Sequence, residues 1–414
     1  MTESRKKILF APYYFYMSMP VYESVIRELK DEYEFSVIRL YKHKIPAEEI
    51  YNEEYFQQKS IRFTDLSLMK SAGQDKRNLK SIIHNRTLHY RNYMIIDRFV
   101  ENECPDLLVI CSDLGDLYIR FLIEICHLRG IPVLIFITGD VLLEQKRPSV
   151  FSIKLNESLF RIKSRFPRYI RARIFSRTLL GTFSLDSKIC VLSEDGRNKL
   201  IQHGLNPDRI IVTKYKSANI PGIPRKDFCD ALNIPEDKRI ITIFTECIHE
   251  VYGKEYLVNL NKKFMQLFSR MDDRNLFIII KLHPRENEEI ISLFSEIFKG
   301  PGMKVVGKIG LDDLILQSEL CIAHYSTVLM TAAIMKKDFL SINIKGERQK
   351  TFIPEQLSDI LEIKSHDEIE KKIARYLDER DYRDKVHSAI GRLEESFGGA
   401  RNRDFKSVVS EYFK

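Results

Sequence analysis

One stretch decides the fold class of this chain: Leu276-Phe277-Ile278-Ile279-Ile280-Lys281-Leu282-His283-Pro284-Arg285. Its apolar part, with three β-branched residues in a row, is typical of a strand that is buried in a parallel sheet. The strand ends directly at His283, so a histidine stands at its carboxyl end. Further along, a strand, a helix, a second strand and another helix are expected, in that order, over 303–306, 311–320, 321–323 and 328–335. This alternation predicts an α/β fold built on a parallel sheet.

The same alternation extends through the rest of the chain. Apolar runs bounded by turn residues predict further strands, separated by helical patterns, over 7–12, 34–40, 105–111, 131–137, 187–192, 208–212 and 239–244. One region breaks the pattern, because residues 42–80 are charged and show little regular spacing. We expect that region to be an insertion that carries helical pieces.

The length of 414 residues suits two domains of about 200 residues each. Residues 214–227 contain two prolines and a glycine and have the composition of a linker. We therefore expect two Rossmann-like, doubly wound domains that face each other across a cleft. The expected bounds are 1–213 for the first domain, 214–396 for the second, and 397–414 for a tail that either covers the outside or returns to the first domain.

Composition argues against several classes of protein. No run approaches the roughly 20 apolar residues of a membrane-spanning helix, and residues 1–7 lead into a strand rather than a signal-peptide core. We therefore expect a cytoplasmic protein. The seven cysteines are an odd number and lack paired metal-ligand spacing, so we expect reduced, largely buried thiols.

A basic segment over 160–180 interrupts the alternation. Between Arg161 and Arg177 it holds seven basic residues and no acidic one, interleaved with aromatic and aliphatic side chains. This composition favours peripheral contact with an anionic membrane, at the inner face of the plasma membrane, through Arg165, Arg168, Arg171 and Arg173. The alternative is a solvated basic helix, or one that pairs with acids elsewhere. Nucleic acid is not an expected partner, because no RNA-binding or recognition-helix motif accompanies the charge.

Two polar clusters follow predicted strands in the second half. His283 follows one strand, and His324-Tyr325-Ser326-Thr327 follows another, directly before a helix. Ligands of open α/β sheets bind outside the carboxyl ends of strands, where helix N-termini offer N–H groups to phosphates. His283 can donate a hydrogen bond or proton to a phosphate, and Ser326 and Thr327 can hold its oxygens. Alternatively, the hydroxyls cap the helix and the histidine serves a turn.

Other residues at the predicted strand ends complete the candidate site. Thr245 and Glu246 end the first strand of the second half and are expected to face the same ligand, whereas His324 either joins them or bridges backbone groups. In the first half, the candidates for a general base follow strands and are Asp113, Asp116 and Asp140. Each of the three is alternatively a helix cap. No DxD motif or zinc-ligand spacing occurs, so we expect no metal.

Two segments of the second half resemble the GT-B glycosyltransferases. They are Lys281-Leu282-His283-Pro284, similar to the HP motif, and the run from His324 to Ala333, similar to the serine-rich motif. The nearest branch includes capsule-polysaccharide transferases, bacterial sialyltransferases and polysialyltransferases, and CDP-glycerol glycerophosphotransferases. The likeness covers most of the chain in architecture but only about ten residues in specific motif.

This resemblance implies an acceptor domain over 1–213 and a nucleotide-donor domain over 214–396, with Pro284 among the nucleotide contacts. No cofactor is implied beyond a nucleotide-activated sugar as substrate. Many members carry an acid that holds the ribose five positions after the motif serine, whereas this chain has Thr331. Sialyltransferase relatives take their general base from two acids and a glycine, and Glu194-Asp195-Gly196 matches these letters at a predicted helix start.

We therefore expect a glycosyltransferase that moves a sugar, or a polyol phosphate, from a nucleotide-activated donor to a surface-glycan or lipid-linked acceptor. Two alternatives remain open. The first is a non-hydrolysing UDP-GlcNAc 2-epimerase of the same architecture, although the Asn-Pro-Arg after a histidine that marks that family is missing. The second is a non-catalytic GT-B-like binding protein, which the missing acid at Thr331 favours.

Overall fold

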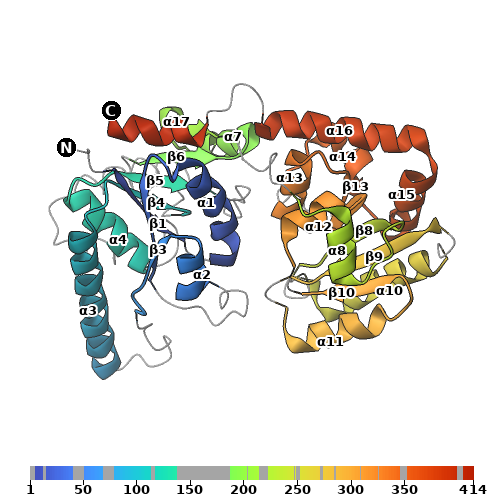
Figure 1. Ribbon diagram of the computed structural model, residues 1–414, viewed down its shortest axis with the longest axis horizontal. Helices are drawn as coiled ribbons and strands as arrows, with labels where there is room; N and C mark the ends of the chain where they lie inside the picture. The colour runs from blue at the N-terminus through green and yellow to red at the C-terminus, as the bar shows by residue number, and fades with distance from the viewer. Residues whose placement is uncertain are drawn as a thin grey trace. The chain divides into compact units, whose positions relative to one another are not determined.

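The computed structural model describes residues 5–12, 15–40, 51–68, 79–112, 117–137, 187–202, 204–213, 222–246, 248, 252–270, 274–283, 286–307, 309–324, 326–345, 352–398 and 404–414. The chain forms two compact units, each with one parallel sheet (Figure 1). Unit 1 comprises Met1–Lys214 and Arg401–Lys414, and unit 2 comprises Tyr215–Ala400. The predicted α/β class is thereby confirmed.

Unit 1 has a seven-stranded sheet in the order β3-β2-β1-β4-β5-β6-β7, and the chain reverses direction across the sheet between β1 and β4. The strands are β1 (Lys7–Ala11), β2 (Glu34–Arg39), β3 (Arg62–Asp65), β4 (Leu107–Ile110), β5 (Val133–Phe136), β6 (Lys188–Val191) and β7 (Ile210–Val212). The helices are α1 (Phe15–Leu29), α2 (Glu53–Gln58), α3 (Leu79–Glu103), α4 (Leu117–Leu128), α7 (Glu194–Gln202) and α17 (Phe405–Ser410).

Over residues 42–80 we expected an insertion with helical pieces; within 51–68 the helix is present as α2, but the strand β3 was not expected. These residues form α2 and then β3, which pairs in parallel with β2 from Ser36↔Arg62 to Arg39↔Asp65. β3 is the edge strand of the sheet, and its ends are exposed. An edge strand does not need a continuous apolar run. Because β3 is charged, the hydrophobic pattern of the sequence does not predict it.

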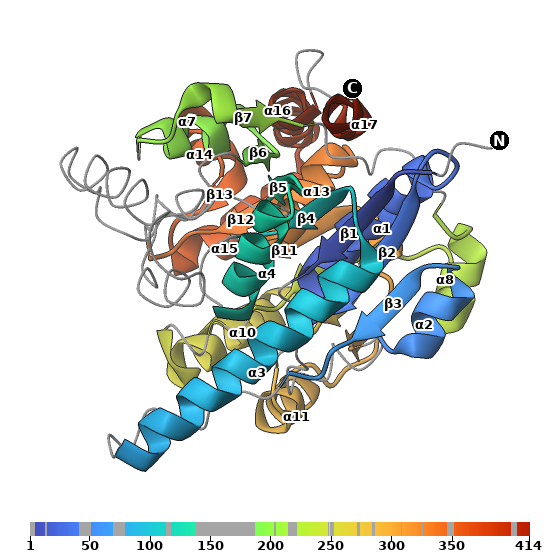
Figure 2. The same cartoon turned by 90° about the vertical axis from the view of Figure 1, so that its left-hand side faces the viewer.

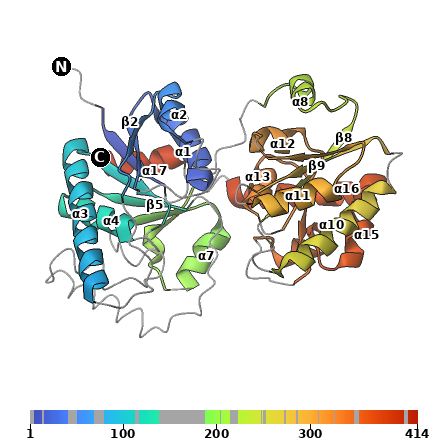
Figure 3. The same cartoon turned by 90° about the horizontal axis from the view of Figure 1, so that it is seen from below.

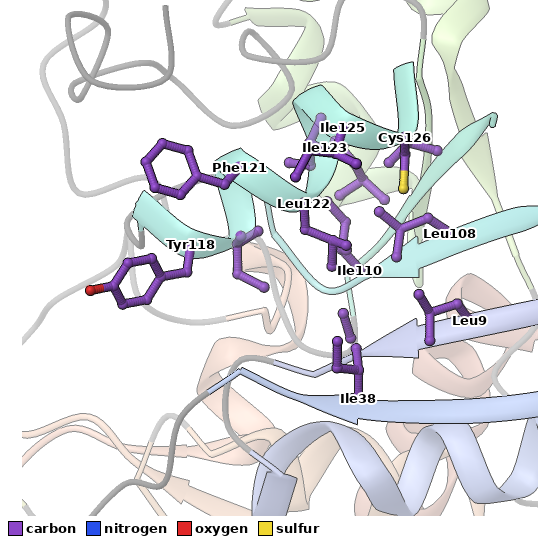
Figure 4. Close-up of a cluster of buried hydrophobic side chains, with 14 of the residues drawn as sticks. Leu9, Ile38, Leu108, Ile110, Tyr118, Phe121, Leu122, Ile123, Ile125 and Cys126 are labelled. Carbon is purple, nitrogen blue, oxygen red and sulfur yellow. The ribbon is translucent and has the colours of Figure 1, made fainter. Parts of the chain in front are cut away.

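One part of the core of unit 1 lies between the sheet and α4. Leu122 and Cys126 of α4 pack over Leu108 of β4 and Leu9 of β1, and all four are completely buried (Figure 4). α3 lies alongside α4, where the Tyr93 and Phe121 rings meet edge to face at 5.3 Å (Figure 2). α4 is therefore an apolar helix sandwiched between the sheet and a second helix.

Unit 2 has a six-stranded sheet in the order β10-β9-β8-β11-β12-β13, with the reversal between β8 and β11. The strands are β8 (Arg239–Phe244), β9 (Leu276–Lys281), β10 (Met303–Val306), β11 (Leu320–Ala323), β12 (Phe339–Ile342) and β13 (Glu362–Ile363). The helices are α8 (Arg225–Leu232), α10 (Lys254–Ser269), α11 (Glu288–Ile297), α12 (Leu311–Gln317), α13 (Thr327–Ile334), α14 (Glu355–Leu361), α15 (His366–Asp378) and α16 (Arg380–Gly398).

The decisive stretch forms β9, between β8 and β10. Ile278, Ile279 and Ile280 expose 2% or less of their surface, although alternate side chains point to opposite faces of the sheet. Helices must therefore cover both faces. α13 and α14 pack with α16, α10 packs with α11 and α15, and α15 also packs with α16.

The tail of the chain packs on unit 1. The Phe405 ring of α17 lies 4.5 Å from the Phe136 ring of β5, and Val408 and Val409 are completely buried. Lys406 forms an ion pair with Glu32. Figure 3 shows α17 beside α1 and β5. The last residues of the chain thus complete the core of the unit that its first residues begin.

Two composition-based expectations can be compared with the described residues. No helix among them is both long and apolar enough to cross a bilayer. The six cysteines in these ranges are free, and Cys126, Cys190, Cys229 and Cys321 are buried while Cys104 is exposed.

Candidate functional site

The carboxyl edge of the unit 2 sheet brings three of the predicted residues onto neighbouring strands. Glu246 follows β8, His283 follows β9 and Ser326 follows β11. β8 lies between the other two, and all three strands are parallel, so their ends meet at one edge. Adjacent strands lie about 4.8 Å apart, which puts β9 and β11 about 10 Å from each other. Side chains that reach inward from both strands can contact one phosphate group.

Thr245 fixes the turn that carries His283. Its hydroxyl accepts a hydrogen bond from the His283 backbone N–H at 2.8 Å and donates one to Glu286 Oε1 at 3.2 Å. The Glu286 N–H returns to the His283 carbonyl oxygen at 3.0 Å. Thr245 is 8% exposed and its hydroxyl is engaged on both sides. We therefore interpret Thr245 as a residue that positions His283, not as a ligand contact.

The N-terminus of α13 lies at the same edge. Ser326 is its N-cap, and its hydroxyl accepts the Val328 N–H at 3.3 Å. Thr327, the first helical residue, is exposed. The unpaired N–H groups and the dipole of a helix N-terminus favour an anion at this place. Ser326 caps the helix, which was one of the two alternatives that the sequence left open. The Thr327 side chain remains accessible to a ligand.

Thr331 has no contact with this edge through its hydroxyl. The Thr331 side chain is 6% exposed, and its Oγ1 donates to the Thr327 carbonyl oxygen at 3.2 Å, one turn back in α13. A threonine that bonds its own helix in this way is common in helix interiors. The residue therefore does not take the place of the acid that many GT-B members carry here.

Glu246 is the group at this edge whose charge is most perturbed. Burial raises the pKa of its carboxyl to about 7, against the opposing effect of a hydrogen bond with the Ser326 side chain. Its Oε1 is buried and, among the described residues, has no hydrogen-bond partner. Near pH 7 this carboxyl is therefore about half protonated.

Lys281 adds positive charge at the end of β9. Burial lowers its pKa to about 8, so the ammonium is still the main form at pH 7. Its Nζ donates to the Leu282 carbonyl oxygen at 2.8 Å. A half-buried cation at a strand end attracts an anionic ligand more strongly than an exposed one does.

His324 is buried beside aromatic rings that the sequence did not single out. Burial lowers its pKa to about 3, so its imidazole is neutral at physiological pH. The His324 ring lies 6.2 Å from Tyr256 of α10, which meets Tyr252 at 5.2 Å. Lys345 Nζ lies 5.3 Å from the Tyr256 ring centre. Two tyrosines at helical spacing, beside a strand end, are the sequence signal that could have found this group.

The acidic pair in the first half has local partners. Ser193 caps α7 by accepting the Gly196 N–H at 3.0 Å. Glu194 lies 3.7 Å from Arg197, and Asp195 lies 2.7 Å from Lys199, both on the same helix. Exposed pairs of this kind support a helix terminus and indicate no role in catalysis.

Several predicted residues lie outside the described ranges. They are the candidate bases Asp113, Asp116 and Asp140, the candidate nucleotide contact Pro284, and the candidate membrane-surface residues Arg165, Arg168, Arg171 and Arg173. Among the residues that are described, no group of three or more His, Cys, Asp or Glu side chains is placed to hold a metal ion.

The sequence profile of the alpha-2,8-polysialyltransferase family (POLYST) matches residues 256–343. This segment begins at Tyr256 of α10, includes His283 and Ser326, and ends just after β12. The match therefore covers the parts of the carboxyl edge that follow β9 and β11, and it does not include β8, Thr245 or Glu246. A search of curated proteins finds no match to the chain.

Solved structures resemble the whole chain at low identity. A UDP-GlcNAc 2-epimerase from Neisseria meningitidis, bound to UDP-GlcNAc, has a TM-score of 0.60 and 14% identity, with 99% of both chains covered. A UDP-glucosyltransferase from Polygonum tinctorium has a TM-score of 0.61 and 12% identity, with 100% of both covered. The glycosyltransferase SnogD from Streptomyces nogalater has a TM-score of 0.57 and 12% identity, with 99% of both covered.

At these identities the solved structures establish the fold, and the family profile adds a specific likeness in one part of unit 2. The chain therefore has the fold of the GT-B glycosyltransferase superfamily, and over residues 256–343 it is similar to the alpha-2,8-polysialyltransferases.

Proposed function

We propose that this protein is a glycosyltransferase that moves a sugar, or a polyol phosphate, from a nucleotide-activated donor to a surface-glycan or lipid-linked acceptor. One observation carries the proposal. His283 and the N-terminus of α13 stand at the carboxyl ends of β9 and β11, within the segment that matches the polysialyltransferase profile. In the proposed assignment unit 2 binds the donor, and unit 1 binds the acceptor.

The chemistry needs the leaving phosphate to be stabilised as its negative charge grows. His283 donates a hydrogen bond or a proton to that phosphate, while Thr327 and the first N–H groups of α13 hold its oxygens. Lys281 adds positive potential, and Thr245 holds the His283 backbone in place. These groups supply the stabilisation without a metal ion or a resident cofactor.

Transfer also needs a base that takes the proton from the acceptor hydroxyl. We assign this role to Asp140 or Asp113 of unit 1, which follow β5 and β4 in the sequence. Proton removal makes the hydroxyl oxygen a nucleophile. With a sugar donor it attacks the activated carbon as the bond from that carbon to the phosphate oxygen breaks, and with a polyol-phosphate donor it attacks the outer phosphorus as the bond between the two phosphates breaks. The nucleotide then leaves with the phosphate.

The epimerase alternative is favoured by one observation, the likeness of the whole chain to solved UDP-GlcNAc 2-epimerases. A single assay separates the functions. The protein is incubated with CMP-sialic acid, CDP-glycerol or UDP-GlcNAc, each with and without an oligosaccharide acceptor. We expect nucleotide release from one donor that depends on the acceptor. UDP-ManNAc formed without acceptor would identify an epimerase, and the absence of any conversion would indicate a binding protein.

We further propose that the protein works at the inner face of the plasma membrane. The support is the basic, aromatic-rich composition of residues 160–180. Replacing Arg168 and Arg171 by alanine should weaken binding to vesicles that contain anionic lipid by roughly 30-fold, because each arginine near such a surface contributes about 1 kcal/mol. Vesicle sedimentation measures this. Equal binding of wild type and variant, or binding to neutral vesicles alone, would contradict the proposal.

A further inference from the structure

The Glu246 carboxyl lies where the sheet of unit 2 reverses direction. Glu246 follows β8 and shares a hydrogen bond with Ser326, which follows β11, so the bond crosses the switch point between these two strands. Ligands of open α/β sheets bind at such a point. The proposed function gives this carboxyl no role, although it follows β8, between the strands that carry His283 and Ser326.

No cation neutralises this carboxyl within the described part of the chain. Lys281, on the neighbouring strand β9, directs its ammonium to the Leu282 carbonyl oxygen. The Thr245 hydroxyl, next to Glu246 in the chain, is used by His283 and Glu286. His324, which directly follows β11, is a neutral imidazole, as its lowered pKa of about 3 requires. Among the residues that the structure describes, the Ser326 hydroxyl is the one polar group that interacts with this carboxyl.

The Ser326 hydroxyl cannot donate a hydrogen bond to Glu246 and to a phosphate at the same time. Its hydroxyl has one proton, and its oxygen already accepts the Val328 N–H at 3.3 Å. When that proton goes to an ionised Glu246, the carboxylate holds two acceptor oxygens beside the helix N-terminus and no proton of its own. A phosphate that arrives there meets a second negative charge in a buried place.

Protonation removes this conflict. An un-ionised Glu246 has no charge to repel a phosphate, and its O–H can donate either to Ser326 or to a phosphate oxygen. The added proton would bind Oε1, which is buried and has no hydrogen-bond partner among the described residues, and would make it a donor. An anion near a buried acid favours the protonated form further, because like charges disfavour ionisation.

We propose that the phosphate site of unit 2 takes up one proton as it binds its ligand, and that Glu246 carries this proton. The inference rests on the proposed function, since it concerns the same site. The proton comes from the solvent, binds a carboxyl oxygen of Glu246 when the phosphate binds, and returns to the solvent when the nucleotide leaves. The site is thereby regulated by pH, with tighter binding under mildly acidic conditions.

The direction of the pH effect follows from the pKa of the free protein. Below pH 6 the carboxyl is already protonated and binding needs no further proton. Above pH 7 each binding event must first protonate it. With a free-state pKa of about 7, the affinity of wild type should fall about tenfold between pH 6 and pH 8.

The test measures binding of the 5′-methyl ester of CMP, with the ester of UMP in parallel, by calorimetry at pH 6, 7 and 8. The phosphate of these esters stays singly ionised over this range, so the ligand adds no titration of its own. Glu246→Gln cannot ionise and keeps an N–H donor. We expect the variant to bind with nearly the same affinity at all three pH values. Glu296→Gln, an exposed acid of α11, should keep the wild-type profile.

A second readout needs no variant. Binding enthalpies of wild type at pH 8, measured in buffers of different ionisation enthalpy, should reveal uptake of close to one proton. Equal pH profiles for wild type and Glu246→Gln, or no proton uptake by wild type, would overturn the inference and leave the proposed function intact. No binding of either ester at any pH would overturn both.

Discussion

The His283→Ala variant should lose about 100- to 10,000-fold of its transfer rate while it keeps its folded structure, which is the range for loss of a general acid or base. The imidazole stands at the end of β9, on a turn that Thr245 holds through the His283 backbone N–H at 2.8 Å. Alanine keeps that backbone bond and removes only the imidazole. The loss should therefore appear mainly in kcat, with a smaller loss of donor binding from the missing hydrogen bond to the phosphate.

Single-turnover kinetics and a thermal melt of the same preparation measure the two effects separately. His387→Ala is the matched control, because this histidine lies on α16 of the same unit, has a side chain that is 69% exposed, and contacts Asp338 just before the start of β12. The control should keep the wild-type rate. A His283→Ala enzyme that transfers as fast as the control would remove the histidine from the mechanism.

Phe405→Ala should destabilise unit 1 by about 3–5 kcal/mol, the usual cost of deleting a buried aromatic ring. The Phe405 side chain is 3% exposed and its ring lies 4.5 Å from Phe136. At about 2–4 °C per kcal/mol for a unit of this size, the melting temperature of unit 1 should fall by about 6–20 °C. The reason is the cavity left between α17 and β5.

Phe413→Ala provides the comparison for that loss. The Phe413 ring contacts Tyr33 at 5.3 Å but is only partly buried, so the same substitution should cost much less. Differential scanning calorimetry resolves the two variants. If they melt at the same temperature as each other and as wild type, the tail does not form part of the unit 1 core.

The sequence predicts most interior strands, although not the buried strand β12, and it predicts the edge strands less well. β8 and β9 could be identified because strands that are buried on both faces need continuous apolar runs, and Ile278 to Ile280 supply one. β3 was missed because an edge strand can be charged. β13 was missed because it has only two residues, of which Glu362 is a buried acid that no apolar pattern reveals.

In the candidate site, the sequence predicts individual residues but not the contacts between them. His283 and Ser326 could be singled out, because each directly follows an apolar strand and polar side chains at a strand end are visible in sequence. The bond between Glu246 and Ser326 could not, since it joins strands that become neighbours only when the sheet reverses direction. The spacing of Tyr252 and Tyr256 is visible in sequence, whereas their contact with Lys345 joins elements that are far apart in the chain.

The central claim is that one edge of the unit 2 sheet holds the phosphate of a nucleotide. Crystals grown with CMP, CDP, UDP or GDP test it most directly. We predict a nucleotide whose phosphate oxygens lie within about 2.7–3.2 Å of the His283 imidazole and of N–H groups in the first turn of α13. A nucleotide bound elsewhere on the chain, or one whose phosphate points away from both groups, would contradict the account.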